Sequence, residues 1–191
     1  MQERKMKTLI FNGSPRLHGD TAWAIARLRE TLPGEIITVD AYRCQISPCV
    51  DCRCCKSHPG CAIQDDMQAV YDHIRTCDNI VIASPVYFTE LTGKLLDVAS
   101  RLQTFFCAGR FRGETPVETP KRGGVILMGG GSGGMDKAFS TARMLLRAMN
   151  CRDIHPLIAS GNTDCVPACQ DPKLPEALTS LADFLMKDNG L

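Results

Sequence analysis

The stretch from Leu9 to Thr21 carries the groups best suited to holding an anion. An apolar run is followed by glycines, hydroxyls and one arginine (LIFNGSPRLHGDT), and a helical pattern begins directly afterwards. Ser14, Arg16 and Thr21 offer hydroxyls and a permanent cation, and a helix N-terminus adds free N–H groups and the positive end of its dipole. The loop has neither the G-x-G-x-x-G fingerprint nor a P-loop G-K-[ST]. We interpret it as a phosphate site, the alternative being an ordinary strand–helix turn.

A second set of residues with chemical potential is the run of cysteines between Cys44 and Cys61. Within it, four cysteines follow the spacing C-x2-C-x2-C-x5-C, namely Cys49, Cys52, Cys55 and Cys61. Four thiolates on so short a loop can surround one compact metal centre, and x2 spacing suits the corners of an iron–sulfur cubane. Tetrahedral zinc accepts the same ligands, and simple thiols without metal are the third interpretation.

Composition limits the classes of protein to consider. The chain has 191 residues, of which 44% are apolar, and a formal charge of +1 without a basic run. We therefore expect no nucleic-acid partner and no membrane partner. No apolar window has membrane-spanning length and the first residues lack the apolar core of a signal peptide, so we expect a cytoplasmic protein. Eleven cysteines indicate metal or redox thiols rather than a disulfide scaffold.

The elements that must position these groups alternate between strands and helices. The pattern predicts an α/β fold with a doubly wound, five-stranded parallel sheet and helices on both faces. We expect a single domain over residues 1–191 with a cysteine-rich insert at 44–61. Asp20 or Thr21 suits the cap of the first helix. Strands are expected at 9–11, 35–40, 79–84, 124–128 and 153–160, and helices at 22–32, 65–76, 93–106, 136–149 and 174–187.

Three loops of unusual composition follow strands of this sheet, at 12–21, 84–92 and 129–134. Ligands of such sheets bind at the carboxyl ends of the strands, so one site built from all three loops is the simplest hypothesis. The second loop offers aromatic surface and backbone donors, and the third brings bare backbone close to a ligand. A flavin mononucleotide (FMN) fits this combination. The candidate ring contacts are Pro85, Val86, Tyr87, Phe88, Gly129, Gly130, Gly131 and Gly134. The alternatives are that Tyr87 and Phe88 are core residues and that the glycine loop only joins a strand to a helix.

Several motifs in fixed order support a family resemblance. They are NGSPR at 12–16 with GDT at 19–21, DDM at 65–67, SPVY at 84–87 and TGKL at 92–95. Together they resemble the flavodoxin-like NAD(P)H-dependent FMN reductases, and most of all the iron–sulfur flavoproteins. The resemblance implies strand order 2-1-3-4-5, non-covalent FMN and a homodimer or homotetramer. It also implies that Ser14, Arg16 and Thr21, with Asp20 beside them, border the phosphate.

The cysteine spacing matches the compact motif of the iron–sulfur flavoproteins, and this likeness implies one [4Fe–4S] cluster on the four cysteines. Two positions depart from the family pattern. Asp20 replaces a common asparagine, which puts a carboxylate close to a dianion, and Ser100 replaces the usual aspartate before Arg101, which puts an ion pair there in doubt.

These observations favour an FMN-dependent oxidoreductase that moves electrons between NAD(P)H, or a ferredoxin-like donor, and an acceptor. The nicotinamide co-substrate and the ferredoxin partner follow from the resemblance alone. Because the cofactor performs the chemistry, we assign no protein acid or base. Two other classes remain open: an electron carrier without a substrate of its own, and a redox sensor based on zinc or thiols.

Overall fold

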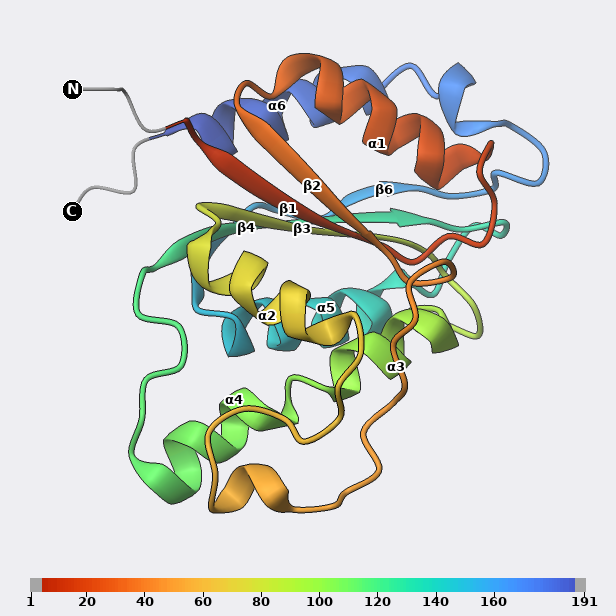
Figure 1. Ribbon diagram of the computed structural model, residues 1–191. Coiled ribbons are helices and arrows are strands. Elements are labelled where there is room, and N and C mark those ends of the chain that lie inside the picture. The colour runs from red at the N-terminus through yellow and green to blue at the C-terminus, as the bar shows by residue number, and fades with distance from the viewer. Residues whose placement is uncertain (1–4, 188–191) are drawn as a thin grey trace.

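The computed structural model describes residues 5–187, and its centre is one parallel sheet (Figure 1). The strand order is β2-β1-β3-β4-β5, with β6 also paired to β4, which confirms the predicted order 2-1-3-4-5. The strands are β1 (Lys7–Asn12), β2 (Glu35–Asp40), β3 (Asn79–Pro85), β4 (Lys121–Met128), β5 (Cys151–Ile154) and β6 (Ile158–Ser160).

Helices cover both faces of the sheet, as predicted. The helices α1 (Asp20–Thr31) and α6 (Leu174–Met186) lie on one face (Figure 1). The opposite face carries α2 (Met67–Thr76), α3 (Gly93–Ser100) and α5 (Met135–Ala148), and α4 (Gln103–Cys107) extends beyond it towards the cysteine-rich segment. Short helical turns complete the described chain: η1 (Cys54–Lys56), η2 (Ala108–Arg112) and η3 (Ala168–Gln170).

The alternation of side chains along the central strands produces two hydrophobic cores. Leu9 and Phe11 of β1 face the α2–α3–α5 layer, whereas Ile10 between them faces α1 and α6. The three residues are almost fully buried, which explains why the run carries no polar residue. The loops after β1, β3 and β4 are therefore attached to a rigid centre.

Two predicted elements are divided in the structure. The strand expected at 153–160 becomes β5 and β6, and Pro156 lies in the gap, where it cannot donate to a neighbouring strand. The helix expected at 93–106 ends at Ser100 and resumes at Gln103 as α4. Between them Arg101 turns its side chain fully into the protein.

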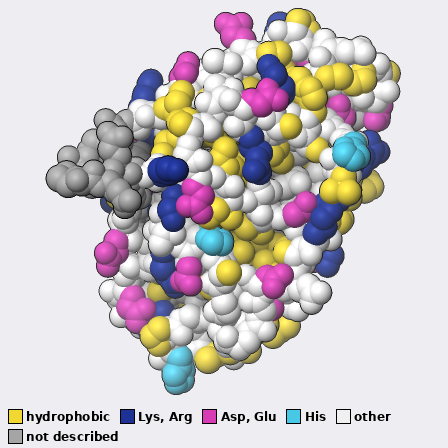
Figure 2. All heavy atoms as spheres, turned by 45° about the horizontal axis from the view of Figure 1, so that its top comes forward, with side chains coloured by type: hydrophobic (Ala, Val, Ile, Leu, Met, Phe, Trp, Pro, Cys, Tyr) yellow, Lys and Arg dark blue, Asp and Glu magenta, His cyan; other side chains and the backbone are white. Residues whose placement is uncertain are grey.

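The surface carries charges of both signs. In the face shown in Figure 2, lysine and arginine side chains are interspersed with carboxylates, in keeping with the formal charge of +1. Among residues 5–187, we find no helix with the length and apolar character needed to cross a bilayer.

Candidate functional site

The loops that follow β1, β3 and β4 meet around a pocket of about 310 Å³. A volume of this size is typical of small-molecule sites. The predicted residues that line it are Ser14, Arg16, Asp20, Thr21, Pro85, Val86, Tyr87, Gly130 and Gly131. Phe88, Gly129 and Gly134 do not line it. The Phe88 side chain is 100% exposed at the tip of its loop, where the backbone has a positive φ of 52°.

The loop after β1 is held in place by its own polar groups. The Ser14 N–H donates to Asn12 Oδ1 over 2.9 Å, and the Arg16 N–H donates to Ser14 Oγ over 3.2 Å. Gly13 allows a close approach to the next loop, since a Cβ there would lie 2.7 Å from Ser84 Oγ. Thr92 Oγ1 also donates to the Gly13 carbonyl over 2.8 Å, which ties this loop to the start of α3.

The polar groups at this end of the pocket suit an anion. Arg16 is exposed, and its guanidinium has no hydrogen bond or ion pair within the described part of the chain. Thr21 is buried in the first turn of α1, and its hydroxyl likewise makes no hydrogen bond to a described residue. The first N–H groups of α1 have no partner inside the helix because no residue precedes them by four positions in it. A cation, a hydroxyl and a helix N-terminus therefore converge on one place.

Asp20 does not have the capping role expected for it. Gly19 is the N-cap of α1, and no side chain caps this end of the helix, so the expectation for Asp20 or Thr21 was wrong. The Asp20 carboxylate instead accepts the N–H of Ala168, the first residue of η3, over 2.7 Å. This hydrogen bond holds the Asp20 carboxylate towards η3 and partly compensates its charge near the Arg16 end of the pocket.

Sequence reasoning missed a fourth loop of the pocket, which follows β6 and contributes Thr163 and Asp164. Its backbone runs along the glycine loop, since the Thr163 N–H donates to the Gly129 carbonyl over 3.0 Å. Gly130 makes room for it, because a Cβ there would lie 2.5 Å from Asp164 Oδ2. The available signal was the turn-rich sequence GNTD directly after the last strand.

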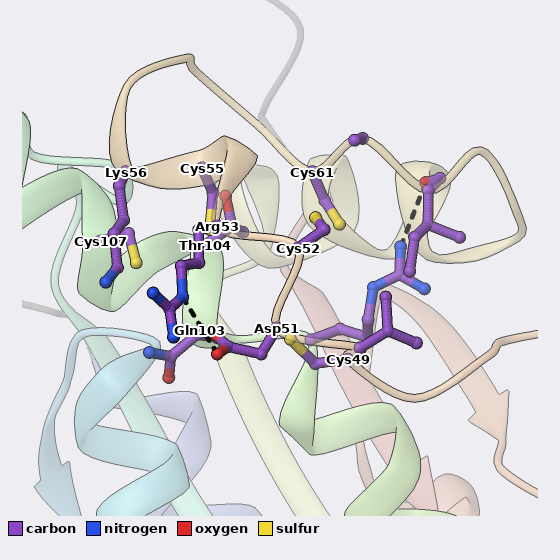
Figure 3. Close-up of a pocket in the computed structure, with 14 residues that line it drawn as sticks. Cys49, Asp51, Cys52, Arg53, Cys55, Lys56, Cys61, Gln103, Thr104 and Cys107 are labelled. Atoms are coloured by element: carbon purple, nitrogen blue, oxygen red, sulfur yellow. Dashed lines mark hydrogen bonds and ion pairs between the residues drawn. The ribbon is translucent and has the colours of Figure 1, made fainter.

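The four predicted metal ligands line a second pocket, beside η1 and α4 (Figure 3). They are Cys49, Cys52, Cys55 and Cys61, and Cys107 of α4 joins them. The free volume is about 20 Å³, enough for one water-sized group. Within residues 5–187, no three His, Cys, Asp or Glu side chains are grouped so that they could hold a metal ion. The four thiols therefore share a pocket without a coordination geometry.

Cys55 is held against α4 at one side of this pocket. The Arg112 guanidinium of η2 donates to the Cys55 carbonyl, and Lys56 lies over the Phe111 ring at 5.0 Å from its centroid. Figure 3 shows Cys55 beside Cys107. Burial and contact with the Cys107 thiol raise the pKa of Cys55 to about 11. Cys107 is buried and also forms part of the pocket wall.

The segment that connects this pocket to α2 also differs from expectation. The helix begins at Met67 rather than Asp65, and Asp65 instead forms an ion pair with Arg101 over 2.7 Å. The doubt about an ion pair at Arg101 was therefore unfounded, because the partner comes from elsewhere in the chain. Ser100, which replaces an aspartate of the family pattern, accepts the N–H of Cys49 on its hydroxyl over 2.9 Å.

The fold and the first pocket define a flavodoxin-like α/β protein with a pocket at the carboxyl ends of its strands whose polar groups suit an anion. The comparison with protein families is specific: the NADPH-dependent FMN reductase family matches residues 6–163. The chain belongs to this family and is an oxidoreductase.

Individual relatives and solved structures agree with the family. An iron–sulfur flavoprotein of Methanocaldococcus jannaschii is 31% identical over 142 residues, which are 71% of this chain and 68% of the relative. A second one from that organism is 25% identical over 163 residues, covering 83% of this chain and 78% of the relative.

The fold is shared with an NAD(P)H:quinone oxidoreductase from Methanothermobacter marburgensis, with a TM-score of 0.73, 15% identity and coverage of 96% and 98% of the two chains. An FMN-dependent NADH-azoreductase from Bacillus anthracis, solved in complex with FMN, gives a TM-score of 0.64 with 14% identity, and the match covers 95% of this chain and 100% of that chain.

Proposed function

We propose that FMN occupies the pocket at the carboxyl ends of β1, β3 and β4, with its phosphate at Ser14, Arg16 and Thr21. The observation that carries this proposal is the pocket itself. It unites the three predicted loops, and its two strongest phosphate-binding groups, the Arg16 guanidinium and the Thr21 hydroxyl, have no partner among the described residues. A phosphate dianion would supply the missing partner for both.

The other lining residues suit the flavin ring. Pro85 and Val86 are half-buried, and Tyr87 is 45% exposed, so they offer apolar surface that a flat ring can cover. Gly130 and Gly131 present bare backbone on the opposite loop. When bound, FMN accepts hydride and passes electrons on, and the protein binds and orients it. We propose NAD(P)H as the donor, in line with the family.

We further propose that Cys49, Cys52, Cys55 and Cys61 hold a [4Fe–4S] cluster. The donor chemistry supports this, since four thiols line one pocket whose wall also contains a buried arginine N–H that has no partner among residues 5–187. The curated relatives are named iron–sulfur flavoproteins. The small free volume means that the loop has to open to receive a cluster. Zinc is the competing occupant, because the same ligands suit it.

The partners and location form a further proposal. A fully exposed Phe88 beside the flavin pocket supports a homodimer or homotetramer in which a second copy covers this loop. Eleven cysteines are typical of a protein in a reducing compartment, so we propose a cytoplasmic location. A ferredoxin-like protein is the proposed alternative electron donor.

Anaerobic purification followed by assays of flavin, iron, sulfide and zinc tests these proposals. We expect about one FMN per chain together with iron and sulfide, and oxidation of NADH or NADPH when an acceptor such as a quinone is present. Bound FMN with no nicotinamide oxidation, but with reduction by a ferredoxin, would favour the electron carrier. Zinc in place of iron and sulfide would contradict the cluster, and a protein that binds no FMN would contradict the flavin site.

A further inference from the structure

The side chain of Arg101 is 0% exposed, although arginine is rarely buried without a reason. It lies at the break between α3 and α4 and forms part of the wall of the cysteine pocket. The Tyr71 hydroxyl donates to the Arg101 carbonyl over 2.9 Å and so holds the backbone of Arg101 in place. From this backbone, the Arg101 side chain reaches the cysteine loop.

The guanidinium joins the two ends of that loop. Its Nη1 donates to the Ser47 carbonyl over 2.9 Å, and its Nη2 donates to the Ile63 carbonyl over 3.1 Å. Ser47 precedes Cys49 by two residues, and Ile63 follows Cys61 by two residues. One side chain thus closes the base of the loop on which all four proposed ligands lie.

Asp65 completes the closure. Its Oδ2 accepts Nη1 of Arg101 over 2.7 Å and also the Ser47 N–H over 3.0 Å. Burial acts to raise the Asp65 pKa, but the guanidinium and the backbone N–H groups outweigh it and lower the pKa. The carboxylate is therefore charged, and it pairs with the guanidinium at the base of the cysteine loop.

One nitrogen of the guanidinium makes no hydrogen bond to a described residue. The Nε of Arg101 is buried and has no hydrogen-bond partner in the described part of the protein. An unpaired buried N–H is costly and calls for an explanation. Cys61 lines the same pocket as Arg101. Burial acts to lower the pKa of Arg101, and Asp65, Tyr71 and Cys61 outweigh it and raise the pKa. The acceptor that this pocket offers to the donor is thus a cysteine sulfur.

We propose that Arg101 is the positioning residue of a sulfur-ligated metal centre. It closes the cysteine loop at Ser47 and Ile63 and reserves its Nε–H for a thiolate or sulfide of that centre. The inference rests on the proposed metal-binding function of the four cysteines. Hydrogen bonds to sulfur raise the reduction potential of an iron–sulfur centre, so Arg101 also affects this potential.

Two changes test the proposal. Arg101→Lys keeps the charge and the Asp65 ion pair but cannot reach both carbonyls and has no Nε. The double variant Arg101→Gln with Asp65→Asn avoids an unpaired buried charge and so guards against simple misfolding. There are two matched controls: the single variant Arg75→Lys and the double variant Arg75→Gln with Asp72→Asn. They are suitable because Arg75 and Asp72 form an exposed ion pair at 2.9 Å on the same layer of helices.

The readouts are iron, sulfide and zinc per chain, the reduction potential of the metal centre, bound FMN and the circular dichroism spectrum. We expect Arg101→Lys to keep FMN and the wild-type spectrum, hold less metal and shift the remaining iron–sulfur centre to a more negative potential. If the centre is zinc, faster loss of zinc to a chelator replaces the shift in potential. The double variant should lose most of its metal, and both controls should match the wild type.

Two results for the Arg101 variants would overturn the proposal. The first is a folded variant with the metal content and reduction potential of the wild type. The second is a parallel loss of metal, FMN and the helical circular dichroism signal, which indicates general unfolding. The wild type separates this inference from the flavin site. FMN without any metal in the wild type would overturn the role of Arg101 and leave the FMN oxidoreductase intact. Metal without FMN would leave Arg101 in place and remove the flavin site.

Discussion

Replacing Arg16 by alanine removes the one cation that lines the proposed phosphate site among the described residues. The Arg16 guanidinium has no partner within residues 5–187, so the substitution removes no hydrogen bond or ion pair there. A charge-assisted hydrogen bond contributes about 1.5–3 kcal/mol, and exposure of Arg16 to solvent reduces that to about 1–2 kcal/mol. The FMN dissociation constant should therefore increase about 5- to 30-fold.

Titration of the apoprotein with FMN, followed by quenching of flavin fluorescence, measures this change. Riboflavin is the sharpest control, because it has the same ring and no phosphate. Arg16→Ala should leave riboflavin affinity unchanged, so the advantage of FMN over riboflavin should fall by the same factor of about 5 to 30. Arg29→Ala is the matched protein control, since Arg29 lies on α1, the helix that follows the Arg16 loop, is exposed and contacts Thr38 rather than the pocket.

Salt gives an independent check on the charge. Raising the ionic strength should weaken FMN binding to the wild type more than to Arg16→Ala, because added ions screen exposed charges. An unchanged FMN affinity in Arg16→Ala, or an equal loss for FMN and riboflavin, would refute the assignment of the phosphate to this loop.

Three further predictions follow from contacts in the structure. Gly130→Ala should weaken FMN binding at least about 5-fold, because its Cβ would lie 2.5 Å from Asp164 Oδ2, whereas Gly133→Ala, in the same loop but outside the pocket lining and with nothing within 4 Å, should bind normally in the same titration. Asp65→Asn should reduce the loss of stability on acidification. The pKa of Asp65 is lower in the folded protein than its value of about 3.9 in the unfolded chain, so Asp65 stabilises the fold at pH values above the unfolded pKa. This contribution is lost as the pH falls through the folded pKa. The free energies of unfolding in urea at pH 7 and pH 3 should therefore differ less in the variant than in the wild type. Cys107→Ala should retain iron and sulfide, since Cys107 is a wall residue and not one of the four proposed ligands; loss of the metal would make it a ligand.

The alternation of strands and helices could be predicted because its causes are local, whereas the strand order 2-1-3-4-5 was implied by the family resemblance. Apolar runs such as Leu9–Phe11 and 79–84 have no charged residue, and each is followed by a turn signal, so the alternation of strands and helices is visible in the sequence. The three loops at the strand ends follow from the same alternation, since parallel strands bring their carboxyl ends to one edge.

The contacts that could not be predicted join residues far apart in the chain. Asp20 lies 148 residues from Ala168, so nothing near it in the sequence indicates that its carboxylate accepts that N–H. The pairing of Asp65 with Arg101 could not be predicted either. Asp65 and Asp66 have the pattern of the first turn of a helix, and Arg101 falls within the predicted pattern of a different helix. Burial of Arg101 overrode the local helical pattern and divided α3 from α4.

The helix α3 has a consequence beyond covering the sheet. Thr92, at the start of α3, donates a hydrogen bond to the Gly13 carbonyl in the loop after β1. Ser100, the last residue of α3, accepts the N–H of Cys49. Eight helical residues span about 12 Å, so the helix acts as a spacer of fixed length between the supports of the two pockets. Inserting or deleting a turn there would change the spacing and relative rotation of both supports at once, so we expect evolution to vary the surrounding loops far more freely than the length of this helix.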